Sequence, residues 1–264
     1  MFFSNTVWFN DRVAAGGIEM KIYKKLWFKI VSVFIILIAV LFGAFFIYAA
    51  NYYHATTVAV AAISQEKSVN VTYDDNMIIF SPKQNGKDIG FVFYPGGKVE
   101  YTAYSPLMVK IAERGITCIL VKMPFNLAVF DSNGADKAIN KLDKISNWYI
   151  GGHSLGGAMA SAYAAGNADK LKGIVFLGAY PSSDLSKTDL KMLSIYGTED
   201  KVLNKEKLDE CRSNEPKNTK YFELKGANHA NYGNYGVQSG DGTATISAEE
   251  QQDIAVKAIV DFIS

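Results

Sequence analysis

The sequence predicts an α/β protein: a mostly parallel β-sheet with helices on both faces, preceded by one transmembrane helix. Short runs rich in apolar residues alternate with helical stretches over residues 69–264, which is typical of a parallel sheet covered on both sides. One uncharged apolar run occupies residues 30–50. The composition suits a single sizeable core, because 49% of the 264 residues are apolar and 20% are charged.

The apolar run IVSVFIILIAVLFGAFFIYAA holds 21 residues without a charge. As a helix it would be roughly 31 Å long, enough to cross a bilayer core of about 30 Å. A cleaved signal peptide usually has an apolar region of only about 7–15 residues, so we expect an uncleaved signal anchor, with cleavage as the alternative. Four lysines lie just before the span, and no Lys or Arg follows it until Lys67. This asymmetry predicts a cytoplasmic N-terminus and an extracytoplasmic domain in the cell membrane.

These patterns divide the chain into a cytoplasmic segment at 1–29, the span at 30–50, a tether at 51–68 and a folded domain at 69–264. The first nineteen residues are neither basic nor periodic, whereas Met20 directly precedes a basic, aromatic stretch typical of an anchor. We therefore hypothesise that translation starts at Met20. The net charge of +1 gives no sign of a nucleic-acid partner, and the oligomeric state is left open.

The first half of the domain begins with one or two edge strands at 69–81. A continuous apolar strand at 89–95 follows, and it leads at once into two glycines. A helical pattern covers 104–114 and stops at Gly115, and the next strand lies at 116–124.

The second half repeats the alternation. Strands are predicted at 147–152, 173–181, 191–197 and 219–226, and helices at 135–145, 156–165, 205–212 and 248–263. Because ligands bind at the carboxyl ends of such strands, the polar residues just past each strand are the candidates for a site.

The stretch GHSLG at 152–156 fits the pattern G-x-S-x-G, which places a serine on a strained strand-to-helix turn. Glycines at 152 and 156 would remove collisions with the neighbouring backbone. An apolar strand precedes the motif and a helix of small residues follows it. We therefore predict that Ser154 is a nucleophile.

A serine hydroxyl needs a general base, and the chain holds only three histidines. His54 abuts the span, and His153 lies inside the turn with its side chain directed away from that of Ser154. His229 remains, just beyond the last strand and before the final helix. We predict that it is the base.

The imidazole in turn needs a carboxylate to orient it and to stabilise its protonated form. Asp200 lies a few residues past the strand at 191–197 and is our first choice. Glu199 is the main alternative, and Asp241 and Glu249 are later ones.

An oxyanion hole requires two N–H donors. We predict the backbone of Leu155, directly after the serine, and of Gly97 in the PGG turn after the strand at 89–95, with Lys98 as the fallback. Neither phosphate-binding glycine pattern occurs, and the spacing of the two cysteines implies no metal site.

With YPGG, GGHSLGGAMA, SIYGTED and GANHANYG in this order, residues 88–264 resemble the α/β-hydrolase superfamily. More narrowly, they resemble the bacterial membrane-anchored group sometimes called the alpha/beta hydrolase fold-5 family. The resemblance implies the α/β-hydrolase fold and hydrolysis of carboxylic esters or similar acyl compounds without a cofactor. It implies much less about the substrate, because the superfamily hosts many chemistries, and we expect a small-molecule or lipid-like ester. Acyl transfer or amide cleavage on the same triad is the alternative, and a non-catalytic membrane-anchored binding protein is another.

Many relatives insert a lid of helices after the strand that corresponds to 173–181. Here only about a dozen residues reach the next strand. We therefore expect no large lid and an open site. The long glycine-rich segment after His229 is expected either to shape the entrance or to pack on the sheet edge.

Overall fold

The computed structural model describes residues 5–65 and 68–264, and the side chains of 24–64 and 68–264. The chain forms two compact units, Met1–Ala50 and Asn51–Ser264. Residues 1–4 lie outside the described residues, and the hypothesis that translation starts at Met20 stays a prediction.

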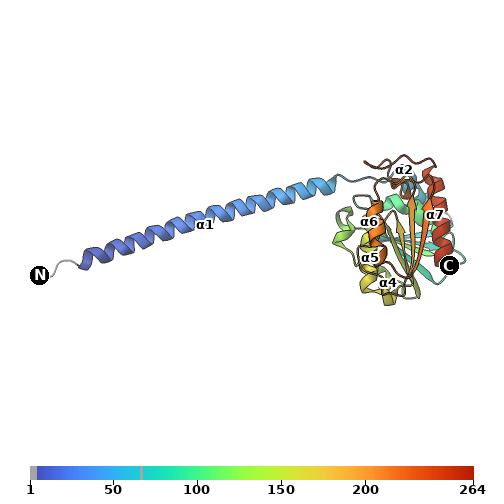
Figure 1. The fold of residues 1–264 in the computed structure, drawn as a ribbon, viewed down its shortest axis with the longest axis horizontal. Helices are drawn as coiled ribbons and strands as arrows, with labels where there is room; N and C mark the ends of the chain where they lie inside the picture. The colour runs from blue at the N-terminus through green and yellow to red at the C-terminus, as the bar shows by residue number, and fades with distance from the viewer. Residues whose placement is uncertain (1–4, 66–67) are drawn as a thin grey trace. The chain divides into compact units, whose positions relative to one another are not determined.

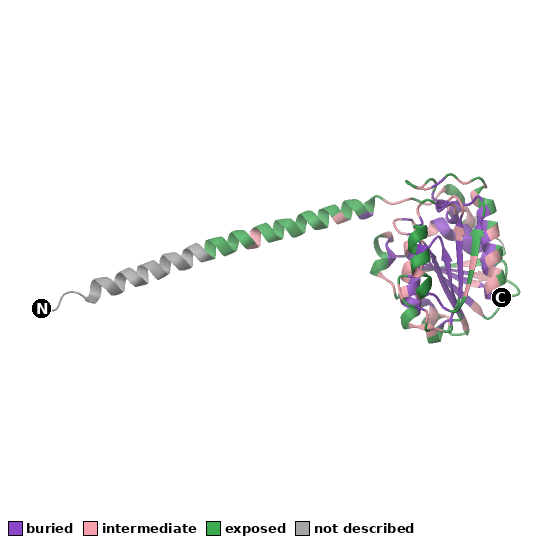
Figure 2. Cartoon of the chain, in the orientation of Figure 1, coloured by how far each residue is buried: buried purple, intermediate pink, exposed green. Residues whose placement is uncertain are grey.

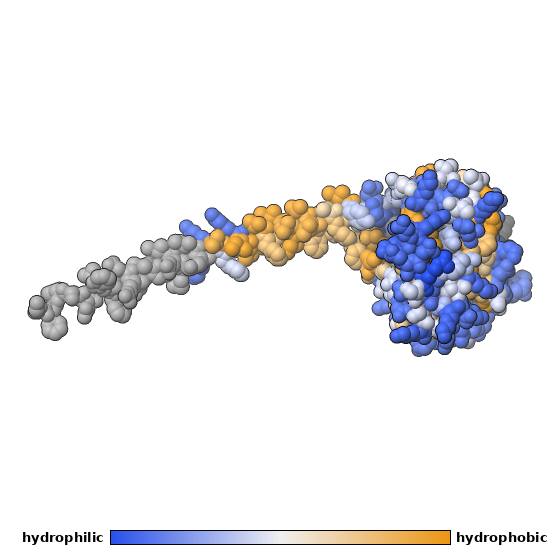
Figure 3. Space-filling view, in the orientation of Figure 1, coloured by the Kyte–Doolittle hydropathy of each residue, from blue (hydrophilic) through white to orange (hydrophobic). Residues whose placement is uncertain are grey.

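The first unit is one helix, α1 (Asn5–Ala50). Its portion Lys24–Ala50 is long and apolar enough to cross a membrane, and it contains the predicted span at 30–50. Large apolar side chains such as Phe28, Phe34 and Ile47 are exposed along this portion. Its visible surface is largely hydrophobic (Figure 3). A helix that is apolar on all sides needs an apolar surrounding, which suits either a membrane anchor or a signal sequence.

The second unit is built on one eight-stranded sheet (Figure 1). Its strands are β1 (Val69–Asp74), β2 (Met77–Pro82), β3 (Ile89–Tyr94), β4 (Thr117–Val121), β5 (Asn147–His153), β6 (Gly173–Leu177), β7 (Lys191–Gly197) and β8 (Asn218–Leu224). The spatial order is β1-β2-β4-β3-β5-β6-β7-β8. The β1–β2 and β2–β4 pairs are antiparallel and all later pairs are parallel. This is the mostly parallel sheet that the sequence predicts.

The α-helices of this unit are α2 (Thr57–Gln65), α3 (Ser105–Ala112), α4 (Ala135–Lys141), α5 (Leu155–Gly166), α6 (Lys205–Glu210) and α7 (Ala248–Ile263). Short 3₁₀ turns are η1 (Tyr101–Tyr104), η2 (Pro124–Asn126), η3 (Ala128–Phe130), η4 (Ala168–Lys170), η5 (Cys211–Asn214) and η6 (Ala230–Tyr232). Helices α3 and α7 pack on one face of the sheet, and α4 and α5 on the other (Figure 1).

Both faces of the central strands are buried (Figure 2). In β3, Phe91 and Phe93 belong to the core on the α3/α7 side, whereas Val92 and Tyr94 belong to the core on the α4/α5 side. Alternate side chains of a strand point to opposite faces, so a strand between two helical layers is apolar throughout. This explains the unbroken apolar runs in the sequence.

The strand order reverses between β3 and β5, because β4 lies on one side of β3 and β5 on the other. At such a point the loops after two adjacent parallel strands diverge and leave a crevice at their carboxyl ends. The turns after β3 and β5 carry Gly97 and Ser154, and the loops after β7 and β8 open at the same edge.

The tether expected at 51–68 is ordered against the domain over residues 51–65. Tyr53 forms a parallel bridge with Val99, and α2 packs on α3. Ala59 of α2 is fully buried. The folded unit therefore begins at Asn51 rather than at residue 69, because a short helix of small residues buries one face despite its weak pattern.

Ala59→Glu should lower the free energy of unfolding by about 3 kcal/mol or more, because it would bury an uncompensated charge. Val58→Glu is the matched control: Val58 is 60% exposed, and a surface change costs within about 0.5 kcal/mol. Denaturant unfolding of the full chain in detergent measures both. Equal stabilities of the two variants would show that residues 51–65 are a tether after all.

Candidate active site

Ser154 lies on the turn between β5 and α5, with φ 51° and ψ −122°. Residues other than glycine rarely adopt a positive φ, and each such residue costs of order 1–3 kcal/mol in backbone strain. The Ser154 N–H donates to the Leu177 carbonyl at 3.0 Å, and the Ser154 carbonyl accepts from Ala158 N–H at 3.2 Å. These two bonds hold the strained turn and leave its side chain half-buried.

The glycines of the motif make this turn sterically feasible. A Cβ on Gly152 would lie 2.5 Å from the backbone of Gly156, and a Cβ on Gly156 would lie 2.2 Å from the carbonyl oxygen of Tyr94. Neither backbone neighbour could move without breaking the sheet or the helix. The close approach expected from the sequence at both positions is therefore present.

His229 and Asp200 form a buried pair, with His229 Nδ1 2.8 Å from Asp200 Oδ2. The other carboxylate oxygen, Oδ1, accepts the N–H groups of Val202 at 2.9 Å and Leu203 at 2.8 Å. These bonds fix the carboxylate so that Oδ2 faces the ring. Both side chains are at most 1% exposed.

The structure brings Ser154 and His229 to one cavity of about 280 Å³. The second ring nitrogen of His229, Nε2, is buried and has no partner among the described residues. No hydrogen bond joins it to Ser154 within that part of the chain. Such contacts often tighten only once substrate is bound, so the free Nε2 remains available to take a proton.

The alternatives from the sequence have other partners. Glu199 accepts from its neighbour Thr198, and Glu249 lies in the first turn of α7. Asp241 accepts the backbone N–H groups of His229 at 3.2 Å and of Ala230 at 2.8 Å. Asp241 therefore holds the histidine loop, while Asp200 alone of these carboxylates contacts the imidazole.

The other two histidines are not placed to act on Ser154. His54 is exposed, and its Nδ1 lies 3.6 Å from a Glu100 oxygen. His153 is buried, and its Nδ1 lies 2.7 Å from the Tyr104 hydroxyl oxygen, to which it is hydrogen-bonded. Burial holds the pKa of His153 well below its usual range, and the adjacent His229 lowers it further, against a smaller opposing effect of the His229 backbone. His153 is therefore neutral near pH 7.

The loop after β3 faces the start of α5. A Cβ on Gly97 would lie 2.8 Å from the Leu155 side chain, so the two predicted oxyanion donors are neighbours. Among the described residues, the structure gives neither the Gly97 nor the Leu155 N–H a protein acceptor. The Lys98 N–H, in contrast, donates to the Asn126 carbonyl at 2.7 Å, which removes Lys98 as the fallback.

Tyr104 is a supporting residue that the sequence did not reveal. Its hydroxyl accepts the Gly96 N–H at 3.1 Å and forms a second hydrogen bond with Nδ1 of His153. The rings of His153 and His229 lie 4.4 Å apart. The loop that carries Gly97 and the side chain of His229 thus contact one buried cluster, for which no local sequence pattern exists.

The cavity at Ser154 has a mainly apolar wall. Its lining residues are Ser154, Leu155, Ala158, Gly178, Ala179, Tyr180, Val202, Leu203, Asn204 and His229. The loop at 178–190 joins β6 to β7 and contains no helix. This agrees with the expectation, based on the short segment between these strands, that no large lid is present. No residue of the glycine-rich segment 231–247 lines the cavity, which favours the packing role for that segment over a role in shaping the entrance.

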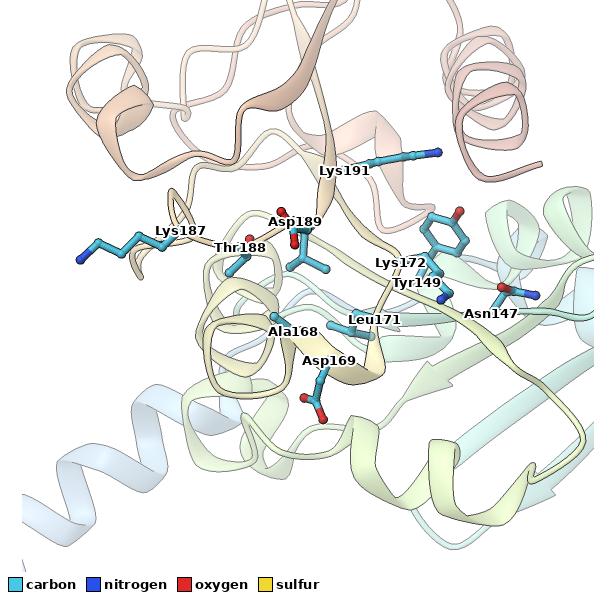
Figure 4. A pocket seen from close by; sticks show the side chains of 11 residues that line it. Asn147, Tyr149, Ala168, Asp169, Leu171, Lys172, Lys187, Thr188, Asp189 and Lys191 are labelled. Atoms are coloured by element: carbon cyan, nitrogen blue, oxygen red, sulfur yellow. The ribbon is translucent and has the colours of Figure 1, made fainter.

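A larger cavity, of about 720 Å³, lies at the opposite edge of the sheet, where β5, β6 and β7 begin. Figure 4 shows its wall, with Lys172, Lys187 and Lys191 among its side chains. None of the predicted site residues contributes to it. Ligands of parallel sheets bind at the carboxyl ends of the strands, so the smaller cavity is the candidate site.

The profile of the alpha/beta hydrolase family matches residues 90–253, more than half of the chain. The chain belongs to this family. It is also similar to the crystal structure of a predicted CIB-like hydrolase from Thermoplasma acidophilum, with 16% identity and a TM-score of 0.52 over 73% of this chain and 98% of that one. At this identity the likeness shows the fold of this α/β hydrolase. No curated protein sequence matches it significantly.

A substitution at Gly178, which follows β6, tests whether the geometry of the His229–Asp200 pair matters for the reaction. It has φ 54°, and a Cβ there would lie 2.9 Å from His229 Nδ1 and 3.1 Å from Asp200 Oδ2. Gly178→Ala should therefore displace the pair and lower kcat for hydrolysis by at least about tenfold, since a 1 Å misplacement costs about 10²-fold.

The matched control is Gly236→Ala, because Gly236 also has a positive φ, 83°, but no atom lies near its missing Cβ. Both variants should lose a similar backbone stability, roughly 1–2 kcal/mol. An equal loss of kcat in the two variants would mean that the pair does not matter for the reaction.

Proposed function

We propose that this α/β hydrolase is a membrane-attached serine esterase that cleaves carboxylic esters through an acyl-enzyme. The observation that supports it best is the free Nε2 of a buried, carboxylate-bound His229 at the cavity that contains Ser154. That arrangement supplies a nucleophile, a base and an orienting carboxylate in the order Ser154, Asp200, His229, which is the chain order of α/β-hydrolase triads.

In the acylation step the Ser154 Oγ attacks the ester carbonyl carbon while His229 Nε2 takes its proton. Negative charge develops on the carbonyl oxygen, where the N–H groups of Leu155 and Gly97 would stabilise it. The C–O bond to the alcohol then breaks, and the imidazolium returns the proton to the leaving oxygen. Asp200 stabilises the imidazolium throughout.

Deacylation reverses these roles with water. The oxygen of a water molecule attacks the acyl carbon of the acyl-enzyme while His229 takes a proton from that water. His229 then donates this proton to Ser154 Oγ when the tetrahedral intermediate collapses. The half-buried serine and the missing lid support access of water to this intermediate. This favours hydrolysis over acyl transfer to another acceptor.

The substrate should present a compact apolar group to the wall formed by Ala158, Val202 and Leu203. A cavity of about 280 Å³ has the size of a small ligand site, below the 300–1,000 Å³ common for drug-sized molecules. No step of this chemistry requires a cofactor.

The role of Ser154 as the nucleophile can be tested by substitution. Ser154→Ala should abolish labelling by a fluorophosphonate and lower kcat by about 10⁴-fold or more, because the nucleophile is lost. Ser213→Ala, at an exposed serine, should change neither. Labelling that persists in Ser154→Ala would contradict the assignment.

Two variants, Asp200→Asn and Glu199→Gln, test which carboxylate orients the imidazole. Asp200→Asn should lower kcat by about 10⁴-fold, because an amide holds the wrong imidazole tautomer. Glu199→Gln changes the adjacent carboxylate in the same way and should leave kcat within about threefold, since Glu199 makes no contact with the imidazole. A larger loss for Glu199→Gln than for Asp200→Asn would reverse the assignment.

The membrane part of the proposal is that α1 stays as an uncleaved anchor with the hydrolase domain outside the cytoplasm. The lysines before the apolar run and their absence after it support this orientation. Anchoring would keep the catalytic domain close to the membrane surface.

The two cysteines offer a direct test of topology. Cys118 is buried and Cys211 is partly exposed in the domain. A membrane-impermeant maleimide added to spheroplasts should therefore label wild type, and Cys211→Ser should lose the label. Labelling that occurs only after lysis would place the domain in the cytoplasm.

A further inference from the structure

We propose that residues 53–56, here termed the strap, are a positioning element of the active site that holds the oxyanion loop, residues 96–100, against the serine. The strap is the first folded stretch after helix α1, which ends at Ala50. The inference rests on the proposed serine chemistry and adds a determinant of its rate outside the triad.

The strap pairs with the oxyanion loop through one isolated β-bridge. The Tyr53 N–H donates to the Lys98 carbonyl at 2.7 Å, and the Tyr53 carbonyl accepts the Glu100 N–H at 2.9 Å. Tyr53 is thereby paired in parallel with Val99. Both bonds fall within three residues of Gly97, the predicted oxyanion donor.

The side chain of Glu100, in the oxyanion loop, also bonds to the strap. Its Oε2 accepts the Ala55 N–H at 3.0 Å, and its Oε1 accepts the Thr102 hydroxyl at 2.8 Å. A carboxylate that accepts from two different segments fixes their relative position more firmly than a neutral acceptor would.

The strap also contacts the loop that follows His229. The Thr56 N–H donates to the Asn234 carbonyl at 2.8 Å, and the Tyr53 hydroxyl accepts the Ser239 N–H at 3.1 Å. The rings of Tyr53 and Tyr235 lie 5.6 Å apart. One segment therefore joins the loop of the oxyanion donor to the loop of the histidine.

This bridge matters because an oxyanion donor acts only at about 2.7–3.1 Å from the developing charge, and losing one donor costs about 10²–10³ in kcat. Tyr104 holds Gly96 from inside the domain, and Asn126 holds the Lys98 N–H. The carbonyl of Lys98 and the backbone of Glu100 are held by the strap. The loop also has bonds of its own, from the Val99 N–H to the Gly96 carbonyl at 3.3 Å and from the Ala103 N–H to the Glu100 carbonyl at 2.9 Å. Without the strap the loop loses the two bonds that join it to Tyr53, and Gly97 can move away from Ser154.

The test compares two proline variants of the full chain in detergent. Tyr53→Pro removes the N–H that donates to Lys98 and the ring that contacts Tyr235. Tyr52→Pro makes the same change one residue earlier, where the structure records no hydrogen bond from the N–H within the described residues. The ring of Tyr52 packs against that of His54, and neither its N–H nor its ring is bonded to the oxyanion loop in the described part of the chain. Two quantities are measured with a fluorophosphonate: the second-order rate constant of labelling and the final fraction labelled.

We expect Tyr53→Pro to lower the rate constant at least about tenfold while the final labelled fraction equals that of wild type. Tyr52→Pro should stay within about twofold of wild type. Ala55→Pro, which removes only the bond to Glu100, should give a smaller loss than Tyr53→Pro, and it carries the test should Tyr53→Pro fail to fold.

Equal rate constants for the position-53 and position-52 variants would overturn the inference. A lower labelled fraction with an unchanged rate constant would also overturn it, because that result means a loss of folded protein rather than a displaced loop. Wild type that does not label at all would instead refute the proposed serine chemistry, and the strap would lose its role with it.

Discussion

The site depends on one constraint, the strained turn that holds Ser154 at φ 51° at the end of a central strand. A serine in this conformation projects its hydroxyl beyond the sheet edge, where loops from the parallel strands β3, β7 and β8 converge. The strained backbone conformation persists because the surrounding structure restrains it. Gly156 packs against the Tyr94 carbonyl, and the Ser154 N–H is hydrogen-bonded to β6. The core on both faces of the sheet thus supports a conformation that the turn alone would not keep.

The turn and the buried His229–Asp200 pair are stabilised in different ways. The pair is held by hydrogen bonds from the backbone, with Asp200 fixed by two N–H groups and the histidine loop by Asp241. A charge that forms on the imidazole during reaction would be far from water, so the fixed carboxylate beside it is the main source of compensation. This is why we assign the orienting role to the carboxylate that contacts the ring.

The strands of the domain, and its helices other than α2, were predictable because both faces of the sheet are covered, so the apolar runs of the strands are long and unambiguous. Helix α2 was missed because it lies in a stretch that has only a weak apolar pattern. The approach of Ser154 and His229 was predictable as well, because a G-x-S-x-G turn and three histidines leave few arrangements, although their catalytic role remains a prediction. The sequence did not reveal the strap, whose bonds are mostly between backbone groups and carry no side-chain signature. Nor did it reveal Tyr104, which meets Gly96 and His153 only through the tertiary fold.

The central claim is that Ser154, His229 and the N–H groups of Leu155 and Gly97 all act on the same carbonyl group of the substrate. A crystal structure of the adduct with a small organophosphate ester tests it most directly. We predict a phosphorus–Oγ bond at Ser154, a phosphoryl oxygen about 2.7–3.1 Å from the N–H groups of Leu155 and Gly97, and His229 Nε2 beside the remaining ester oxygen. An adduct on another residue, or a phosphoryl oxygen that points away from both N–H groups, would contradict the account.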